Sequence, residues 1–545
     1  MLDHLNRRLI EAGVQIWAHD GRLRYRAPRG ALTDELRADL TAHREALLAE
    51  LTGASGAADF PLTEIQAGYV VGRTAAYADG GVGCQGYHQF DVDTGAAGIP
   101  LAARAARISA AWDAVVAAHP MLRVRVDPDL FAQRVDESLD VSVVVTETLD
   151  EAAAEAENES LAALLTEHVY DVTQARPLVD AALVLGPDSA VLHLSVDLIV
   201  TDYVGIRTIV DDLDQALGGA QIRPPAATFQ EYLAADAASR TSPESAAARR
   251  RAQEYWAQRL PKLAPPLRFA ARGPGETSGS GYSRRSHTLT AGEWAGICAT
   301  AARCEATPAA VLLADFAETA AAQGHPRSTI MMTSVDRRPI VPDADRIVGD
   351  FTSTVVVELA AGADRTAAVR AVRDDIFAGL EHSSVSGMQV ARRLAADARS
   401  QTTMPVVFTC TVAAAGGEAP RLLTPRPGTG RSRTPQVLLD VQVTPLPDGV
   451  SLDWDSRDDG FSPEVLDAAF ADFVARVRAT AGGEQTDGVV AALAAAHDRL
   501  ALGGAAAAAL AEDSEQMVRE VMAWHLQRVG MRGRQRGDDA VGLFS

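Results

Sequence analysis

Three ionisable side chains interrupt an apolar stretch that runs from Leu192 to Ile206, LHLSVDLIVTDYVGI: His193, Asp197 and Asp202. In a β-strand His193 and Asp197 share one face, and their H-x-x-x-D spacing suits acyl transfer in which a histidine acts as general base. The two aspartates also form a D-x-x-x-x-D pair. A third interpretation is structural: one aspartate caps the following helix and the other pairs with an arginine. The local pattern leaves all three open.

Another carboxylate, Asp440, lies in the apolar segment QVLLDVQV (436–443). In a strand, alternation places Gln442 on the same face as Asp440. A carboxyl group can donate and accept a proton in turn, which is what general acid–base catalysis requires. The alternative is an exposed strand residue, although a segment this apolar gives little reason for one.

Alternating helix and strand patterns position these residues from Phe60 onward. The patterns predict helices over 105–119, 203–217, 307–324 and 462–481, strands over 190–200, 328–335, 404–412, 436–444 and 450–456, and a charged, mostly helical bridge over 227–260. They indicate two α/β lobes, 60–235 and 236–485, with related helix and strand content. An Ala/Gly-rich linker (486–513) and one more amphipathic helix follow.

Composition narrows the possible classes of protein. The 545 residues carry a net charge of −21, with 47% hydrophobic and 23% charged residues, which is typical of a globular protein and argues against a general role on nucleic acid or anionic membrane. No run of 18 apolar residues and no secretory signal is present, so we expect a cytoplasmic protein. The four cysteines show neither disulfide nor zinc spacing, and we expect no metal.

Residues 1–52 form a separate unit, joined to the rest by the linker 53–59. A short helix, the segments VQIW and RLRYR around Asp20-Gly21, and a leucine-spaced helix predict an αββα arrangement with a β-hairpin. Arg22, Arg24 and Arg26 alternate onto one face of the second strand, and an exposed strand edge of this charge would favour an acidic partner. The alternative is a small packing subdomain.

Ten motifs follow one another from Phe60: FPLTEIQAGYVVGR (60–73), GVGCQGYHQFDV (81–92), AWDAVVAAHPMLRVRV (111–126), the D-x-x-x-x-D strand, TFQEYL (228–233), YWAQRL (255–260), VGDFTSTVVVEL (348–359), PVVFTCTV (405–412), RTPQVLLDVQV (433–443) and LDWDSRDDGF (452–461). Their order closely resembles the heterocyclization (cyclization) domains of nonribosomal peptide synthetases, within the condensation-domain superfamily. Residues 1–52 resemble the N-terminal docking domains that precede such modules. Residues 514–545 resemble the first helix and loop of a carrier domain.

The resemblance implies a fold and a reaction. The fold is α/β, with two chloramphenicol-acetyltransferase-like lobes in a V-shaped pseudodimer around a central tunnel, plus the αββα docking domain. Donor and acceptor carrier domains deliver thioesters on their phosphopantetheine arms, so no cofactor is bound directly. The amine of a carrier-bound Cys, Ser or Thr attacks the upstream acyl thioester, and the side chain then closes a thiazoline or oxazoline ring with loss of water.

The resemblance also assigns residues. It implies that Asp440 acts as general acid/base and that Thr409 is its hydrogen-bonding partner. It places Gln442, Gln436, Cys410 and Met331 at the substrate tunnel. It makes Asp197 and Asp202 structural, with Arg337, or secondly Arg338, as the arginine that pairs with Asp202.

Several positions depart from the family pattern. Leu198 occupies the place of the second histidine of ordinary condensation domains, which is typical of the cyclization type and weakens the proposal that His193 is a base. Met331 and Asp336 replace asparagines, Cys410 replaces a serine, Tyr203 fills a normally small position and His88 replaces an acidic residue.

These departures keep other functions open. The chain could catalyse condensation alone or ring formation alone, serve as a non-catalytic platform that recruits carrier proteins, or act as a free acyltransferase through His193. We expect an upstream carrier or synthase subunit to bind residues 1–52, and an adenylation domain elsewhere to select the amino acid.

Overall fold

The computed structural model describes residues 59–482, except for 75–79, 96–98, 272–280, 398–403, 413–421, 427 and 447, and parts of the first 43 residues. Most of the predicted linker 53–59, the linker 486–513 and the carrier-like segment 514–545 lie outside the described residues.

The predicted N-terminal hairpin is present. Strand β1 (Gln15–His19) pairs antiparallel with β2 (Arg22–Arg26), so that Gln15 lies opposite Arg26 and His19 opposite Arg22. The side chains of Arg22, Arg24 and Arg26 lie outside the described residues. Their common face therefore stays a prediction.

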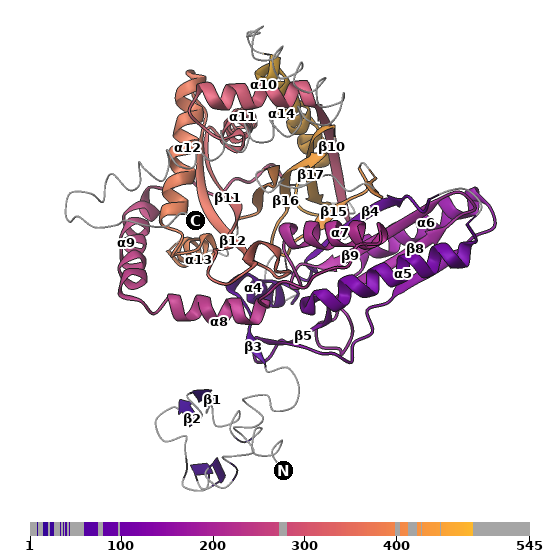
Figure 1. Ribbon diagram of the computed structural model, residues 1–545. Helices are drawn as coiled ribbons and strands as arrows, with labels where there is room; N and C mark the ends of the chain where they lie inside the picture. Colours follow the sequence, from indigo (N-terminus) through magenta and orange to yellow (C-terminus); the bar gives the residue numbers. More distant parts are fainter. Residues whose placement is uncertain are drawn as a thin grey trace, which may run out of the picture.

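The first lobe is built on a mixed sheet with strand order β14-β4-β9-β8-β7, and β15 also pairs with β4. Its elements, with a small three-stranded sheet (β3, β5, β6) at one side, are β3 (Phe60–Pro61), α4 (Glu64–Gly72), β4 (Gln85–Val92), α5 (Leu101–Ala118), β5 (Val124–Asp127), β6 (Ala132–Val135), β7 (Val143–Glu147), α6 (Glu151–Glu167), β8 (Val179–Leu185), β9 (Ala190–Asp197) and α7 (Tyr203–Leu217). A 3-10 turn (Pro120–Arg123) joins α5 to β5. The long helices lie along the sheet (Figure 1).

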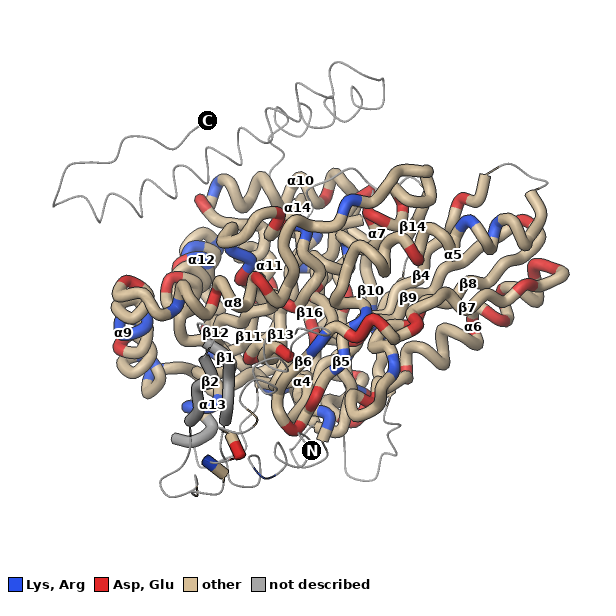
Figure 2. The backbone as a smooth tube through the Cα atoms, turned by 60° about the horizontal axis from the view of Figure 1, so that its bottom comes forward, with Lys and Arg blue, Asp and Glu red and all other residues tan. Residues whose placement is uncertain are grey.

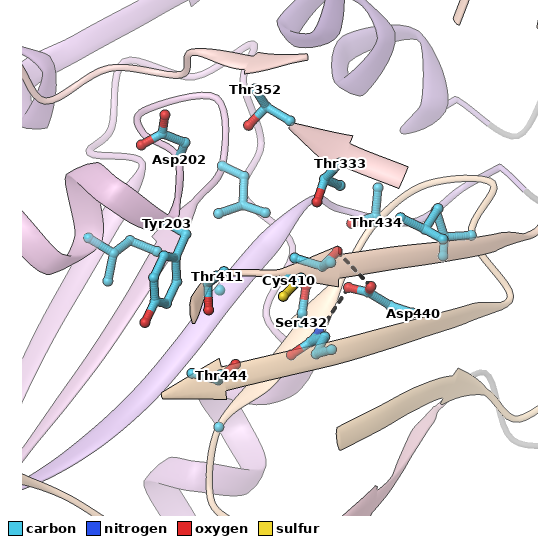
Figure 3. A pocket seen from close by; sticks show the side chains of 18 of the residues that line it. Asp202, Tyr203, Thr333, Thr352, Cys410, Thr411, Ser432, Thr434, Asp440 and Thr444 are labelled. Carbon is cyan, nitrogen blue, oxygen red and sulfur yellow. Dashed lines mark hydrogen bonds between the residues drawn. The ribbon is translucent and has the colours of Figure 1, made fainter. Parts of the chain in front are cut away.

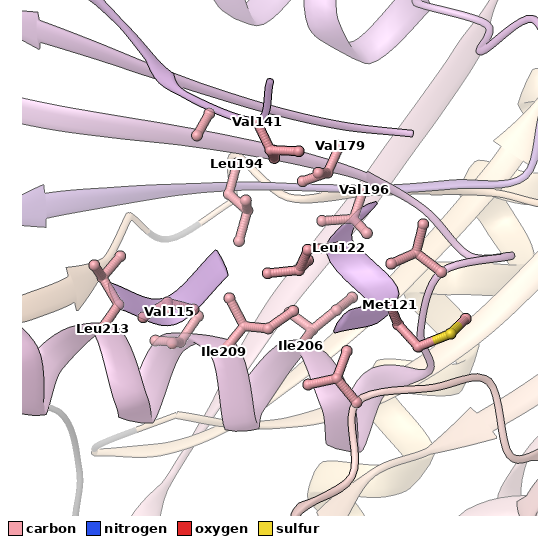
Figure 4. Close-up of a cluster of buried hydrophobic side chains, with 14 of the residues drawn as sticks. Val115, Met121, Leu122, Val141, Val179, Leu194, Val196, Ile206, Ile209 and Leu213 are labelled. Atoms are coloured by element: carbon pink, nitrogen blue, oxygen red, sulfur yellow. The ribbon is translucent and has the colours of Figure 1, made fainter. Parts of the chain in front are cut away.

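Strand β9 is buried along its whole length because helices cover both faces of the sheet. Leu194 and Val196 meet α5 and α7 in the first hydrophobic core, where Ile209 and Val115 face them (Figure 4). Alternate residues of β9 point toward α6. The apolar character of LHLSVDLIV follows from this position between two helical layers.

The second lobe carries a six-stranded sheet with the order β10-β17-β16-β13-β11-β12. Its elements are β10 (Tyr282–Thr290), α10 (Ala291–Arg303), α11 (Pro308–Ala322), β11 (Arg327–Val335), a 3-10 turn (Ala344–Arg346), β12 (Thr352–Ala360), α12 (Arg365–Glu381), α13 (Gly387–Asp397), β13 (Val406–Cys410), β16 (Leu439–Leu446), β17 (Gly449–Arg457) and α14 (Pro463–Gly482). Helices α10, α11, α12 and α14 pack against one face in a second core around Trp454, Phe316 and Phe473. The opposite face of this sheet points toward the first lobe.

The predicted bridge consists of two helices, α8 (Phe229–Ser239) and α9 (Pro243–Arg259), which begin at the N-caps Thr228 and Ser242. Residues 240–242 separate the two helices, and Pro243 opens α9. Proline is favoured in the first turn of a helix. Lys and Arg are interspersed with Asp and Glu along the chain, α9 included (Figure 2).

The predicted division into lobes at residues 235 and 236 is wrong in one respect. Strands β14 (Leu423–Pro425) and β15 (Arg431–Arg433) come from the second half of the chain but pair antiparallel with β4 of the first sheet. We call residues 422–433 the strap. Without the strap β4 would be an open edge, and pairing satisfies its backbone groups.

Among the described residues, no single helix is long and apolar enough to span a membrane. Helices α10 and α11 pass such a test only as a pair, and they meet at 96°.

Candidate active site

The face of the second sheet that points toward the first lobe carries two rows of side chains in register. One row runs across the sheet through six residues: Val356, Met331, Val407, Asp440, Asp455 and Arg284. The adjacent row is polar throughout: Thr354, Thr333, Thr409, Gln442, Asp453 and Ser286. Alternation explains the pattern, because the intervening residues of five of these strands, β11, β12, β13, β16 and β17, belong to the second core or pack against it.

A cavity of about 1930 Å³ lies between this face and the first lobe. Both lobes and the strap contribute to its wall, as expected for a binding site between two packed units. Asp202 and Tyr203 of the first lobe lie on one side, and Asp440 and Thr444 of β16 on the other (Figure 3).

Asp440 is 8% exposed and both of its carboxylate oxygens accept hydrogen bonds. Thr409 Oγ1 donates to Oδ1 at 2.9 Å, and Gln442 Nε2 donates to Oδ2 at 2.8 Å. Dashed lines mark hydrogen bonds at the Asp440 carboxyl group in Figure 3. The structure thus brings together the three residues that the sequence suggested. Thr409 and Gln442 are also paired across β13 and β16, which fixes their positions beside the carboxyl group.

The pKa of Asp440 is raised to about 6, chiefly by burial and also by the nearby Asp455 carboxylate, against the lowering effect of the hydrogen bonds from Gln442 and Thr409. A carboxyl group with this pKa exchanges its proton near neutral pH. Such a group can serve first as an acid and then as a base.

Arg284 and Asp455 extend this network along the sheet. Arg284 Nε donates to Asp455 Oδ1 at 2.6 Å, and Asp455 Oδ2 also accepts a hydrogen bond from Gln442 Nε2 at 3.1 Å. The strap joins through the backbone N–H of Ser432, 2.8 Å from Asp455 Oδ2. Sequence reasoning missed Arg284 and Asp455, although alternation in YSRRSHTLT and SLDWDSR could have placed them on one face.

The other residues assigned to the tunnel also line the cavity: Gln436, Cys410 and Met331. Gln436 follows the strap and has a positive φ of 66°. Cys410 adjoins Thr409, but its side chain packs against the second core, and burial raises the pKa of its thiol to about 11. A neutral thiol is a poor nucleophile, so this environment does not activate Cys410.

Asp202 ties the two lobes together. It caps α7 by accepting from the Gly205 N–H at 2.8 Å, it pairs with Arg337 Nη2 at 3.1 Å, and its Oδ2 accepts from the Phe351 N–H at 3.2 Å. The structure selects Arg337 over Arg338, which instead bonds Asp236. The structural interpretation therefore describes Asp202 as both a cap and an ion-pair partner.

Asp197 has an ion pair that sequence reasoning missed. Arg73, the C-cap of α4, holds both of its carboxylate oxygens at 2.6 and 2.7 Å, and the backbone N–H of Ile199 adds a bond at 3.0 Å. A carboxylate buried to 0% exposure needs such partners. Through these bonds Asp197 joins the end of β9 to the end of α4.

His193 is unavailable as a base. One ring nitrogen bonds the Tyr87 hydroxyl at 2.8 Å, the other bonds the Asn158 amide oxygen at 2.9 Å, and burial lowers its pKa to about 4. Leu198, by contrast, lines the cavity and cannot accept a proton. These observations exclude the acyltransferase reading of the H-x-x-x-D spacing.

Two further departures from the family pattern, Tyr203 and His88, face the cavity. Burial and the charge of Arg284 lower the pKa of His88 to about 4, so its ring is neutral near pH 7. Asp336 instead lies near Arg240 and Arg338. Among the described residues, no group of three His, Cys, Asp or Glu side chains is arranged to hold a metal ion.

Residues 99–412 match the model of the condensation domain. The chain belongs to the condensation-domain family. Residues 3–52 match the TubC N-terminal docking domain. The family that the motif order indicated, with a docking domain in front of it, is therefore confirmed.

Relatives of this condensation-family chain include two synthetases. It is 34% identical to pyochelin synthetase PchF of Pseudomonas aeruginosa over 504 residues, which cover 87% of this chain and 27% of that protein. It is 32% identical to phenyloxazoline synthase MbtB of Mycobacterium bovis over 435 residues, 78% of this chain and 30% of that protein. The chain thus spans less than a third of either synthetase.

A solved structure shares the architecture. The cyclization-docking bidomain of the EpoB nonribosomal peptide synthetase from Sorangium cellulosum superposes with a TM-score of 0.68 at 26% identity, covering 89% of this chain and 99% of that one. The predicted α/β fold of two lobes behind a docking domain agrees with this match.

Proposed function

We propose that the cavity is the active site of a heterocyclization reaction. Its substrates are an acyl thioester and a Cys, Ser or Thr thioester, each carried on the phosphopantetheine arm of a carrier domain. The product is a carrier-bound thiazoline or oxazoline. The observation that carries the proposal is Asp440, a buried carboxyl group with a pKa raised to about 6 that is oriented by Thr409 and Gln442 within the cavity.

The first step forms an amide. The acceptor amine attacks the donor carbonyl, a C–N bond forms, the C–S bond breaks and the donor thiol leaves with a proton. Leu198, which by the family resemblance takes the place of the base of ordinary condensation domains, lines the cavity, so this step depends on holding two tethered substrates together. Positioning alone supplies several kcal/mol toward such a reaction.

The second step closes the ring and uses Asp440. The side-chain thiol or hydroxyl group attacks the amide carbonyl, and its proton passes to the carbonyl oxygen, which becomes a hydroxyl group. Protonated Asp440 gives its proton to that hydroxyl, which leaves as water. The carboxylate then takes the proton from the ring nitrogen as the C=N bond forms, and Asp440 returns to its starting state. Thr409 and Gln442 keep the carboxyl group aimed at both positions.

The comparisons support this reaction class. One relative is named a phenyloxazoline synthase, and a similar structure is a cyclization-docking bidomain. Because the chain spans only 27% and 30% of the two synthetases, the substrates and partners remain part of the proposal.

Asp440→Asn tests the assignment. With both carriers charged, mass spectrometry of the acceptor carrier should show open amide that accumulates and at least a 100-fold loss of the ring product, 18 mass units lighter, since asparagine cannot exchange the proton. Thr409→Val should lose less. The control Asp188→Asn changes an exposed aspartate of the first lobe and should cyclize normally. Undiminished ring formation by Asp440→Asn would refute the role.

Met331 favours one alternative function, condensation without ring formation. It places an apolar, 7% exposed side chain two positions across the sheet from Asp440, where a polar residue could assist water departure. A domain limited to condensation would release only the open amide, and wild-type protein in the same assay distinguishes the two.

Residues 1–52 match a docking-domain model, and we propose that they bind an upstream carrier or synthase subunit. Deleting them should lower product formation at low micromolar partner concentration. A high partner concentration should restore product formation in the deletion variant, because docking acts by raising effective concentration. Loss at every concentration, with the remaining chain folded, would contradict the proposal.

A further inference from the structure

The cavity wall changes character at Asp440. On one side of Asp440 the row continues through Asp455 and Arg284, and on the other through Val407 and Met331. Asp440 on β16 therefore marks the boundary between a charged half of the cavity wall and an apolar half.

The apolar half is completed by residues from three segments. Met404 precedes β13 and is 8% exposed, while Met388 and Ala391 belong to α13, and all of them line the cavity with Met331 and Val407. We call these five residues the methionine compartment. Met331 and Met404 also belong to one buried apolar cluster, against which Val407 and Ala391 pack.

The compartment is closely built. A Cβ atom on Gly387 would lie 2.6 Å from the Met331 sulfur and 3.0 Å from the backbone carbonyl carbon of Thr354, so the start of α13 lies close against the sheet. Met388 reaches across to Gly68 of α4. The neighbouring charge, Arg392, is paired with Glu64 at 3.1 Å. The compartment therefore offers apolar atoms with no unpaired charge among these neighbours.

The chemistry at Asp440 determines what must lie here. The carbonyl carbon that becomes the ring carbon bears an oxygen, a nitrogen and the remainder of the acyl group. Oxygen and nitrogen must reach Asp440, so the remainder of the acyl group points along the wall. An apolar acyl group placed against the charged half would remove water from charged side chains without forming new hydrogen bonds, which costs free energy. Burying the same group in the methionine compartment is favourable.

We propose that the methionine compartment binds a bulky apolar acyl group next to the reacting carbonyl, and that a planar aromatic ring fits it best. Methionine side chains adapt to shape, and their sulfur atoms make favourable contacts with aromatic rings. The occupant's identity as an acyl group rests on the proposed function. The compartment's preference for apolar rings does not.

A binding experiment reads the compartment without turnover. The full chain is labelled with [methyl-¹³C]methionine and titrated with benzoyl-pantetheine or acetyl-pantetheine, with signals assigned by single Met→Leu variants. Ring currents from the benzoyl probe should move the methyl signals of Met331, Met388 and Met404 by about 0.1 ppm or more, and the acetyl probe should move them several-fold less. Met121, buried in the first core, should not move. Absence of these shifts, or equal shifts at Met121, would overturn the inference.

A filling variant tests the consequence for turnover. Ala391→Phe occupies the compartment and should reduce the preference for benzoyl over acetyl donors at least ten-fold in amide formation. Ala367→Phe makes the same change at an exposed position of α12 and should leave the preference unchanged. An unaltered preference in Ala391→Phe would overturn the inference. Normal methionine shifts without ring formation would instead count against the proposed function alone.

Discussion

Asp440 shares its sheet face with two more carboxylates, Asp453 and Asp455, and with the guanidinium group of Arg284. Arg284 is bonded to Asp455 and lies 3.8 Å from Asp453, so the cation neutralises part of the charge that surrounds Asp440. Asp455 raises the pKa of Asp440 and Arg284 lowers it. The proton affinity of Asp440 thus depends on two residues that need not contact the substrate.

Substituting Asp455 and substituting Arg284 should therefore shift the pKa of Asp440 in opposite directions. In the pH–rate profile of ring formation, the inflection that we expect near pH 6 should fall by up to about one unit in Asp455→Asn and rise in Arg284→Gln. Asp448→Asn, at an exposed position, should leave it in place. Shifts of the same sign in the two variants would contradict this account.

Asp350 is a buried carboxyl group that the proposed reaction does not use. Its Oδ1 accepts from the Thr352 N–H at 3.0 Å, while Oδ2 has no hydrogen-bond partner within the described part of the chain. Burial, with help from the charges of Asp202 and Asp197, raises its pKa to about 8. Asp350 is therefore protonated at neutral pH.

This proton should make stability depend on pH. The folded chain keeps the proton up to about pH 8, while an unfolded aspartate releases it near pH 4, so stability falls as pH rises between these values. Asp350→Asn removes that loss, and we expect it to be more stable than wild type by about 1–3 kcal/mol at pH 8, with no such gain near pH 4. Thermal unfolding at several pH values measures this. A gain independent of pH would point to packing instead.

At the scale of elements, the end of α4 determines where the segment after the strap can lie. A Cβ atom on Gly72 would come within 2.3 Å of the Pro435 Cβ, and Pro435 directly precedes Gln436 on the cavity wall. The helix and this segment are in contact only because position 72 has no side chain.

Gly72→Ala should therefore displace the segment. We expect a destabilisation of about 1–3 kcal/mol and a loss of ring formation that exceeds the loss of carrier binding, measured by unfolding and by the mass-spectrometric assay. Gly292→Ala, on α10, is the control, because its new Cβ would meet only the Thr290 hydroxyl at 4.0 Å. Equal behaviour of the two variants would show that the contact is unimportant.

The regular elements were predictable from the sequence, because their periodicity is local. The expected helix 203–217 is α7 with the same bounds, and the strand around Asp440 is β16. The strap was not predictable: β14 and β15 have three residues each and pair with a strand more than 330 positions earlier. Segments this short carry no periodic signal.

The residues of the candidate site also divide into those that the sequence predicts and those that it does not. Alternation within one strand sufficed to place Gln442 beside Asp440, and the motif resemblance indicated Thr409. The contributions of Arg284, Asp455 and Arg73 depend on register between strands or on helix placement. Those are set by tertiary packing, which a single sequence does not display.

At the scale of the whole molecule, the Asp202–Arg337 pair joins the two halves of the chain. Both side chains are almost fully buried, and the Arg337 guanidinium also lies 3.8 Å above the Phe351 ring. The pair therefore holds the segment after β11 against the start of α7.

Arg337→Met should be costly because it leaves Asp202 as an unpaired buried charge, and we expect a loss of about 3 kcal/mol in unfolding free energy. Adding Asp202→Asn should recover part of it. Arg338→Met is the control, since that half-exposed residue pairs with Asp236 and should cost less than about 1 kcal/mol. Equal losses from the two arginine variants would contradict the difference in burial.

The strap and the Asp202–Arg337 contact join the lobes at two separate places, so the cavity is ringed by chain. Two lobes joined at one place could rotate apart about a hinge. Two lobes joined at two places leave substrates to enter through the open ends of the cavity. The two joints also differ in strength: the strap rests on two three-residue ladders, and the other joint on a buried ion pair. In native-state hydrogen exchange, amides of β4 that face the strap should follow local openings of that weaker joint, while amides of β9 wait for global unfolding.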